Sequence, residues 1–167
     1  KFYKMDLLSK LGFLTAELTL KQIDIDLCNR ENIGVVVANS ASSLDTDIVY
    51  QESISNRAKY YPSPSVFVYT LPNIMIGEIS IRNKFKGENA FFVTEHFNCR
   101  HLFNYAHELF VHKRIDACLL GWVELFRDNY ESLFMFVEPA GKALQRKEEG
   151  LIIPFTEEQL DEIYKRM

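Results

Sequence analysis

The stretch from Leu71 to His112 constrains the fold of this chain more than any other segment. It begins with Pro72 and Asn73, and isoleucines follow at helical spacing. A proline near the first helical position and an apolar stripe predict an amphipathic helix that opens at residue 72. The stripe consists of Ile74, Ile76, Ile79 and Ile81. Gly87 is expected to end this helix, because glycine readily adopts the backbone conformation of a helix C-terminus.

A short apolar run, Ala90 to Val93, comes next, and a second helical pattern begins almost at once. The members of that pattern are Phe97, Leu102, Phe103, Ala106, Leu109 and Phe110. This order predicts a strand, a tight elbow and a helix. In α/β proteins a residue on such an elbow lies beside a helix N-terminus, where free N–H groups favour negative charge. His96 occupies this position and is the first candidate for a catalytic residue.

The segment from Leu71 to Glu124 resembles, without a gap, the nucleophile-bearing segment of the β-ketoacyl-acyl-carrier-protein synthases. The matching positions are Leu71-Pro72-Asn73, Gly77, Lys86-Gly87, Thr94, Asp116 and the run from Gly121 to Glu124. They correspond to the family's P-N, G, K/R-G-P, T-A-C, A-D and A-G-G-A-E motifs. The resemblance implies a thiolase-like α/β fold, a mostly parallel sheet with helices on both faces. It also implies that residues 1–167 form a single domain like the N-terminal half of such a synthase.

The chain departs from this family where the family carries its nucleophile. The family has Thr-Ala-Cys, whereas this chain has Thr94-Glu95-His96, with Cys99 three residues after the histidine. A thiolate near a helix N-terminus attacks thioesters readily because the helix dipole lowers its pKa. An imidazole cannot form the same stable acyl-thioester. The resemblance therefore implies a synthase-like protein of fatty-acid or polyketide-type biosynthesis that lacks condensing activity and acts as a partner or chain-length-factor-like subunit.

The length of the chain favours the same interpretation. Family members consist of two similar halves, and the second half supplies two histidines that assist the reaction, whereas 167 residues hold one half. We therefore expect a homodimer or a heterodimer with an active synthase, with acyl carrier protein as a possible further partner. The alternative is an acyl-thioester transferase or condensing enzyme that uses His96 or Cys99 with a partner's residues.

A metal site is a further hypothesis for this region. His and Cys are zinc ligands, and a spacing of three residues puts His96 and Cys99 on one helix face, with His101 nearby. The set lacks a fourth ligand and follows no known zinc pattern, so neither a metal nor a cofactor is predicted. Cys99 and His101 are poorly aimed as a nucleophile pair, because helix neighbours two apart do not face each other. The simplest interpretation of His96 is a partly buried, hydrogen-bonded and inert residue.

A second candidate site follows the continuous apolar run from Ile33 to Ala38, which predicts a buried parallel strand. Ser40 and Ser42 lie in the loop after this run, at the carboxyl end of the strand, where α/β proteins usually bind ligands. They are the candidates for substrate binding. The simpler interpretation is that these serines and Ser43 cap the next helix, expected over residues 44–57.

Composition argues against several classes of function. The formal net charge of −4 gives no electrostatic basis for binding nucleic acid. No apolar run reaches the roughly 18 residues that a membrane span needs. Three cysteines without CxxC spacing argue against a disulfide framework and favour a reducing, cytoplasmic location. The aromatic share of 13% predicts a large apolar interior or an extensive partner surface.

The remaining periodicities give the element order α, β, α, α, β, α, β, β, α. The further elements are a helix over 5–21, antiparallel strands over 115–123 and 132–137, and a helix over 156–167. Pro62 and Pro64 predict a surface connector, and residues 141–150 predict a charged, mobile loop. The resembled family has one more strand, expected in the middle of the sheet. Either residues before Lys1 supply it, which we favour because a gap would leave two ladders of backbone groups unpaired, or the sheet closes differently.

Overall fold

The computed structural model describes residues 2–55, 57–139 and 155–166. Its centre is a four-stranded sheet in the order β2-β1-β3-β4. The strands are β1 (Ile33–Asn39), β2 (Asn89–Val93), β3 (Ala117–Phe126) and β4 (Asn129–Val137). β1 runs parallel to both β2 and β3, and β4 runs antiparallel to β3. The predicted α/β fold with a mostly parallel sheet is confirmed.

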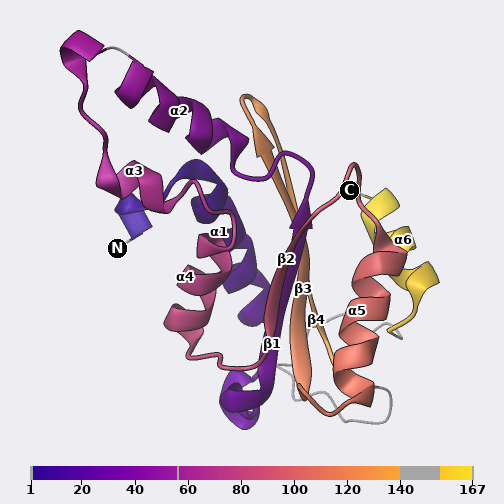
Figure 1. Cartoon of the computed structure of the whole chain (residues 1–167). Helices are drawn as coiled ribbons and strands as arrows, with labels where there is room; N and C mark the ends of the chain where they lie inside the picture. Colours follow the sequence, from indigo (N-terminus) through magenta and orange to yellow (C-terminus); the bar gives the residue numbers. More distant parts are fainter. Residues whose placement is uncertain (1, 56, 140–154, 167) are drawn as a thin grey trace.

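Helices cover both faces of the sheet (Figure 1). α1 (Leu7–Leu20) and α4 (Ile74–Asn83) lie on one face, and α5 (Cys99–Val111) and α6 (Glu157–Lys165) lie on the other. α2 (Leu44–Ser55) leads away from the sheet on the side of α1 and α4, and the chain returns through α3 (Pro64–Val68), so that these two helices form an arm. The described connections also contain short 3-10 helices, η1 (Phe2–Lys4), η2 (Ile25–Leu27), η3 (Arg30–Asn32) and η4 (Arg57–Lys59).

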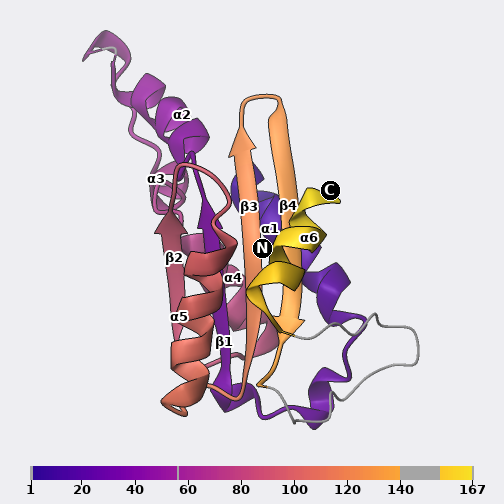
Figure 2. The same cartoon turned by 90° about the vertical axis from the view of Figure 1, so that its right-hand side faces the viewer.

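β1 is buried along its whole length because both of its faces are covered. Val35 and Val37 pack into the apolar cluster beneath α1 and α4, and Val36 and Ala38 pack into the cluster beneath α5 and α6. A parallel strand between two helical layers has no solvent face, which explains the continuous apolar run. Figure 2 shows the sheet from the side of α5 and α6, with β2 and β4 at its edges.

Of the two alternatives for the middle of the sheet, the structure of these residues shows the second, a sheet that closes without a further strand. β1 and β3 are direct neighbours, paired from Ile33 opposite Ala117 to Ala38 opposite Trp122. The facing backbone groups of these strands are therefore satisfied by each other, and no gap remains between them. In the part of the chain that the structure describes, the edges open to another strand are the outer edges of β2 and β4.

The leucines of α1 recur at helical spacing, yet three of them do not face the core. Leu7, Leu14 and Leu18 are 56%, 50% and 61% exposed. The buried face combines two leucines with small residues: Leu8, Ser9, Gly12, Ala16 and Leu20. The small side chains let α1 lie close to α4, whose Met75 side chain fills the space beside Gly12. Close helix approach, rather than the number of leucines, therefore determines which side of α1 faces the core.

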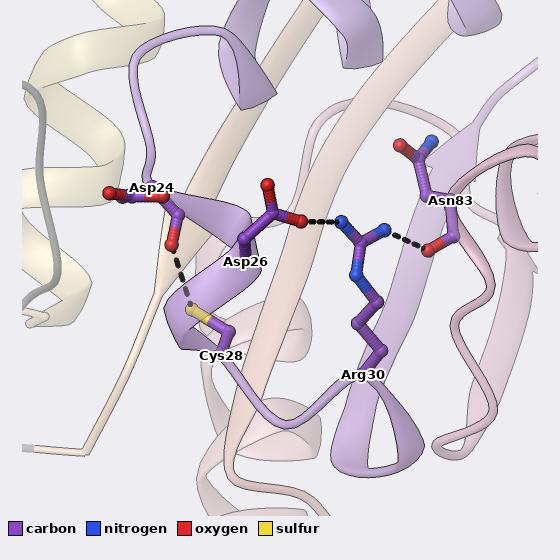
Figure 3. Close-up of polar contacts among 5 residues, drawn as sticks. All are labelled: Asp24, Asp26, Cys28, Arg30 and Asn83. Atoms are coloured by element: carbon purple, nitrogen blue, oxygen red, sulfur yellow. Dashed lines mark hydrogen bonds and ion pairs between the residues drawn. The ribbon is translucent and has the colours of Figure 1, made fainter.

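A set of polar contacts fixes the connection between α1 and β1 to the end of α4 (Figure 3). The Arg30 guanidinium donates to the backbone carbonyl of Asn83 at 2.6 Å and to the Asp26 carboxylate at 2.6 Å. The thiol of Cys28 donates to the carbonyl oxygen of Asp24 at 3.9 Å in the same loop. These contacts tie the entrance of β1 to the neighbouring helix and so keep the strand in register.

The end of α4 does not depend on Gly87, contrary to the prediction. The helix ends at Asn83, and Lys84 adopts the left-handed conformation (φ 60°) that often terminates a helix. Gly87 has a different function, because the chain passes very close to β1 there. A Cβ atom on Gly87 would lie 2.6 Å from the backbone C and O atoms of Ile33.

At two turns the structure can be compared directly with the prediction from the local sequence. Pro64 begins α3 instead of excluding a helix, because the first helical position needs no amide hydrogen. The predicted antiparallel hairpin is confirmed, with Arg127 and Asp128 between the last pair of β3 and β4 and Arg127 at φ 55°. The loop predicted at 141–150 lies outside the described residues.

Within the described ranges, no helix is both long and apolar enough to cross a membrane.

Candidate functional site

His96 lies in a longer connection than the sequence predicts. β2 ends at Val93 and α5 begins at Cys99, so residues 94–98 separate the strand from the helix. The Thr94 hydroxyl donates to the carbonyl oxygen of His96 at 2.9 Å, which bends this connection. His96 itself is exposed. The interpretation of His96 as a partly buried residue is therefore wrong, and the tight elbow is replaced by an open bend.

The N-terminus of α5 is satisfied by a residue other than His96. Asn98 is the N-cap, and its side-chain oxygen accepts a hydrogen bond from the His101 amide at 2.9 Å. This cap occupies one of the amide groups that would otherwise favour an anion. His96 lies three residues before the first helical residue, Cys99, so the helix dipole acts on Cys99 more directly than on His96.

Cys99 is half-buried, and its surroundings disfavour a thiolate. Burial raises the pKa of the Cys99 thiol above its ordinary value, and the negative charge of Asp161 on α6 raises it further. Backbone hydrogen bonding at Arg100 and at Cys99 itself lowers this pKa by less. A raised pKa reduces the fraction of thiolate, which is the nucleophilic form. Cys99 therefore lies against α6 in an environment that suits packing better than nucleophilic attack.

The histidines and acids near this bend do not converge. The exposed ring of His101 contacts the Phe92 ring edge to face, with centroids 4.5 Å apart. Among the residues that the structure describes, no group of three His, Cys, Asp or Glu side chains is placed to hold a metal ion. The three candidates His96, Cys99 and His101 thus follow one another along the chain without forming a common binding site in the described structure.

An aromatic cluster fills the space behind the bend. Phe97 is 8% exposed, stacks on Tyr164 of α6 with centroids 4.1 Å apart, and meets Trp122 of β3 edge to face at 5.9 Å. Glu131 accepts hydrogen bonds from the Trp122 indole at 2.5 Å and from the Tyr164 hydroxyl at 2.9 Å. Sequence reasoning did not find this cluster, although the single tryptophan in a buried strand was a signal for it.

Ser40 is engaged by the chain's own carboxylate. Its amide donates to Glu124 Oε2 at 2.6 Å and its hydroxyl donates to the same oxygen at 2.7 Å. The amide of Ala41 contacts both carboxylate oxygens, at 3.2 and 3.3 Å. The loop does lie at the carboxyl end of β1, as predicted, and in the described structure its donors point at Glu124 of β3.

The neighbouring serines also make contacts other than the predicted caps. Ser42 has a positive φ of 54°, its amide donates to the Asn39 side chain at 2.9 Å, and its carbonyl accepts from that side chain at 2.8 Å. The buried Ser43 hydroxyl donates to the carbonyl of Thr70 at 2.5 Å, which joins the loop to the segment before α4. The Ser40 hydroxyl therefore binds to another segment, whereas the Ser43 hydroxyl binds mainly to Thr70 and also reaches the Asp47 carboxylate in the first turn of α2 at 3.4 Å. The predicted caps are replaced by these contacts.

Comparisons with known proteins support the fold. No protein-family model matches the chain, and no curated protein matches it in sequence. Among solved structures, the ishigamide ketosynthase/chain length factor superposes with a TM-score of 0.72 at 23% identity, covering 86% of this chain and 46% of that one. A complex of a type II polyketide synthase acyl-carrier protein with its hexaketide-bound ketosynthase gives a TM-score of 0.61 at 20% identity, with coverage of 73% and 36%.

A third solved structure is the ketosynthase ApeO in complex with its chain length factor ApeC from Xenorhabdus doucetiae. It gives a TM-score of 0.54 at 13% identity, covering 74% of this chain and 48% of that one. The chain thus spans less than half the length of each of these three structures. At these identities the comparison concerns the fold, and the expectation of a thiolase-like fold is confirmed: the chain shares its architecture with part of the ketosynthase and chain-length-factor chains.

Proposed function

We propose that this chain is a ketosynthase-like subunit of fatty-acid or polyketide-type biosynthesis that lacks condensing activity and acts by pairing with an active ketosynthase, in the manner of a chain length factor. The proposal treats residues 1–167 as one domain that corresponds to the N-terminal half of a synthase. In the second version of this proposal, the chain pairs with another copy of itself and forms a homodimer. Acyl carrier protein would then meet the assembled pair in the cytoplasm.

The observation that carries the proposal is the Thr94-Glu95-His96 sequence at the bend after β2. The resembled family has its nucleophilic cysteine at the position of His96. Here the position holds an exposed imidazole, and the nearest thiol, Cys99, is half-buried with a raised pKa. A condensing reaction needs an activated thiolate to carry the acyl chain, and neither residue supplies one.

The outer edge of β2 supports a pairing function. Within the described residues β2 pairs with β1 alone, so one row of its backbone N–H and C=O groups faces outward. Asn89 and Val93 at its ends are exposed, and Phe91 and Phe92 between them are half-buried. Such an edge is a template for adding a strand from a second subunit. The X. doucetiae structure, which has a similar fold, contains a ketosynthase in complex with its chain length factor.

The decisive experiment combines purification with an activity assay. The tagged chain is expressed in its native cell, and the co-purifying proteins are identified. We expect an active ketosynthase in the complex, and condensing activity toward acyl- and malonyl-carrier protein only when that partner is present. The chain alone should give no 3-oxoacyl product. Product formation by the isolated chain would instead support the thioester-transferring alternative through His96 or Cys99.

A further inference from the structure

The loop that follows β1 places three hydrogen-bond donors around one carboxylate group. The donors are the Ser40 amide, the Ser40 hydroxyl and the Ala41 amide, and all of them reach Glu124 within 2.6 to 3.3 Å. Consecutive amides that point at one anion form a concave binding site for negative charge, and hydrogen bonds to an ionised group are the strong ones. We call this set of donors the Ser40–Ala41 cradle.

The cradle is shaped by contacts that do not involve Glu124. Asn39 is fully buried, and its side chain holds Ser42 through two hydrogen bonds, to the amide and to the carbonyl. Ser42 has a left-handed backbone, which turns the loop back on itself. Ser43 fastens the far side of the loop to the Thr70 carbonyl. The donors of the cradle are therefore positioned by the loop itself, and Glu124 fills a site that its neighbours have formed.

The position of Glu124 in the sheet explains why its carboxylate needs these donors. Glu124 lies directly opposite Glu131 across the β3–β4 pair, an arrangement of like charges that costs free energy. Each carboxylate has its own donors: Glu131 binds the Trp122 indole and the Tyr164 hydroxyl, and Glu124 binds the cradle. The cradle thus provides hydrogen-bond donors for the carboxylate of Glu124.

A second contact links the same two parts of the molecule. The backbone amide of Arg127, at the tip of the β3–β4 hairpin, donates to Asp45 in the first turn of α2 at 3.1 Å. Glu124 and Asp45 together connect the start of the α2–α3 arm to β3 and its hairpin. α2 buries only Thr46 of its described side chains, so apolar packing contributes little to holding this helix. Polar contacts at its start therefore contribute to where the arm lies, together with the hydrogen bond from the Thr46 hydroxyl to the Asp6 carboxylate at 2.7 Å.

We propose that the Ser40–Ala41 cradle is a carboxylate-binding site that Glu124 occupies in cis, and that this occupancy sets the position of the α2–α3 arm. The chemistry that fits the cradle is a carboxylate on a small, unhindered carbon, because two amides and a hydroxyl converge on one group. Ser40 is then a ligand of an internal anion rather than of a substrate. The proposal concerns the isolated chain and does not depend on its pairing with a ketosynthase.

The test removes the internal carboxylate and offers an external one. In Glu124→Ala, amide hydrogen exchange at Ser40 and Ala41 should be faster by about tenfold or more, because hydrogen bonds to a charged group are lost. Sodium acetate should slow this exchange again, and sodium chloride at the same ionic strength should not. The matched control is Glu52→Ala, which removes an exposed carboxylate from α2 and should leave exchange at the cradle unchanged.

The arm supplies an independent readout in the same variants. Glu124→Ala should also speed proteolysis within the α2–α3 arm, and acetate should reverse this effect. Glu124→Gln keeps the shape of the side chain and loses its charge, so it serves as the test if the alanine variant does not fold. It should give an intermediate rate of amide exchange at Ser40 and Ala41. Unchanged exchange at Ser40 and Ala41 in both variants would overturn the proposal. Rescue by chloride as strong as by acetate, or no rescue at all, would overturn the carboxylate-binding site.

Discussion

The ring of Tyr164 on the last helix stacks on the ring of Phe97, which follows the candidate residue His96, with centroids 4.1 Å apart and planes inclined by 24°. The two residues are far apart in sequence and come from α6 and from the bend before α5. Together with Leu160, which is 2% exposed, Tyr164 fixes α6 over the face of the sheet that α5 leaves open (Figure 2). The bend at His96 is thus supported from behind by the C-terminal helix.

The first prediction concerns this stacking. Tyr164→Ala should lower the free energy of unfolding by about 1–3 kcal/mol, since a half-buried aromatic ring is removed from its contacts. Tyr164→Phe keeps the ring and loses the hydrogen bond to Glu131, so it should cost only about 1 kcal/mol. Urea unfolding followed by near-ultraviolet circular dichroism measures both. Equal losses in the two variants would mean that the hydrogen bond, and not the stacking, holds α6.

The second prediction is a dependence of stability on alkaline pH. Burial raises the pKa of Tyr164 to about 12, and the hydrogen bond to Glu131 and the charges of Glu131 and Glu124 add to the effect. In the unfolded chain the tyrosine has a pKa of about 10. Because the folded pKa is the higher one, the contribution of Tyr164 is complete below about pH 10 and is lost as pH rises toward about 12. The difference in stability between wild type and Tyr164→Phe should shrink over this range.

The third prediction uses two glycines as a matched pair. Gly87→Ala should destabilise the protein by about 1–3 kcal/mol, because the new Cβ would lie 2.6 Å from the backbone of Ile33 and β1 would have to shift. Gly77→Ala, inside α4 with no atom within 4 Å of the new Cβ, should stabilise it by roughly 0.5–1 kcal/mol. Thermal unfolding of both variants is the measurement. A neutral Gly87→Ala would show that the contact with Ile33 relaxes freely.

The fourth prediction concerns the reactivity of a thiol at the candidate site. In His96→Cys, the new thiol should alkylate like an ordinary exposed thiol of pKa about 8.5, because residue 96 lies outside α5 and Asn98 caps the helix. Cys118, buried with a pKa raised to about 12, should not react in the folded protein and serves as the internal control. The pH dependence of iodoacetamide alkylation gives the pKa of the thiol at residue 96. A strongly depressed pKa at residue 96 would reveal an activated elbow that the described geometry lacks.

The fifth prediction tests the edge of β2. Val93→Lys places a charge at the end of this strand and should weaken association with a partner subunit or a second copy by at least about tenfold, because charged side chains on an edge strand block pairing. Val111→Lys is the matched control, since Val93 and Val111 are both 57% exposed and Val111 lies at the end of α5. Light scattering and a pull-down with the partner are the measurements. Equal effects of the two substitutions would place the interface elsewhere.

The order of the principal elements could be predicted because each is specified locally. The spacing of apolar residues, helical in some segments and strand-like in others, gives the principal helices and strands in their observed order. Thr156, whose hydroxyl accepts a hydrogen bond from the Gln159 amide, marks the start of α6 as expected. The errors lie where one segment depends on another. Leu14 and Leu18 follow a helical period and yet face outward, because the packing of α1 against Met75 selects the small-residue face.

At the candidate site, too, the local features could be predicted from the sequence and the contacts between distant segments could not. The sequence alone identified the loop of Ser40 and the bend of His96, since both follow a strand in an α/β pattern. It could not show that Glu124, 84 residues after Ser40, would supply the carboxylate for that loop, or that Tyr164 would stack on Phe97. These contacts depend on the pairing of β1 with β3 and on the placing of α6, which hydrogen bonds between distant segments determine.

The sequence by itself therefore determined the elements, the α/β class and the presence of a histidine at residue 96, because backbone preference, hydrophobic period and residue identity are local properties. Tertiary structure alone decided that β1 and β3 meet without a gap, that His96 lies on an open bend, and that the donors of the Ser40 loop close on Glu124. The physical reason is that the direction of a hydrogen bond and the burial of a side chain depend on atoms brought together from distant segments. A local pattern limits those arrangements and does not choose among them.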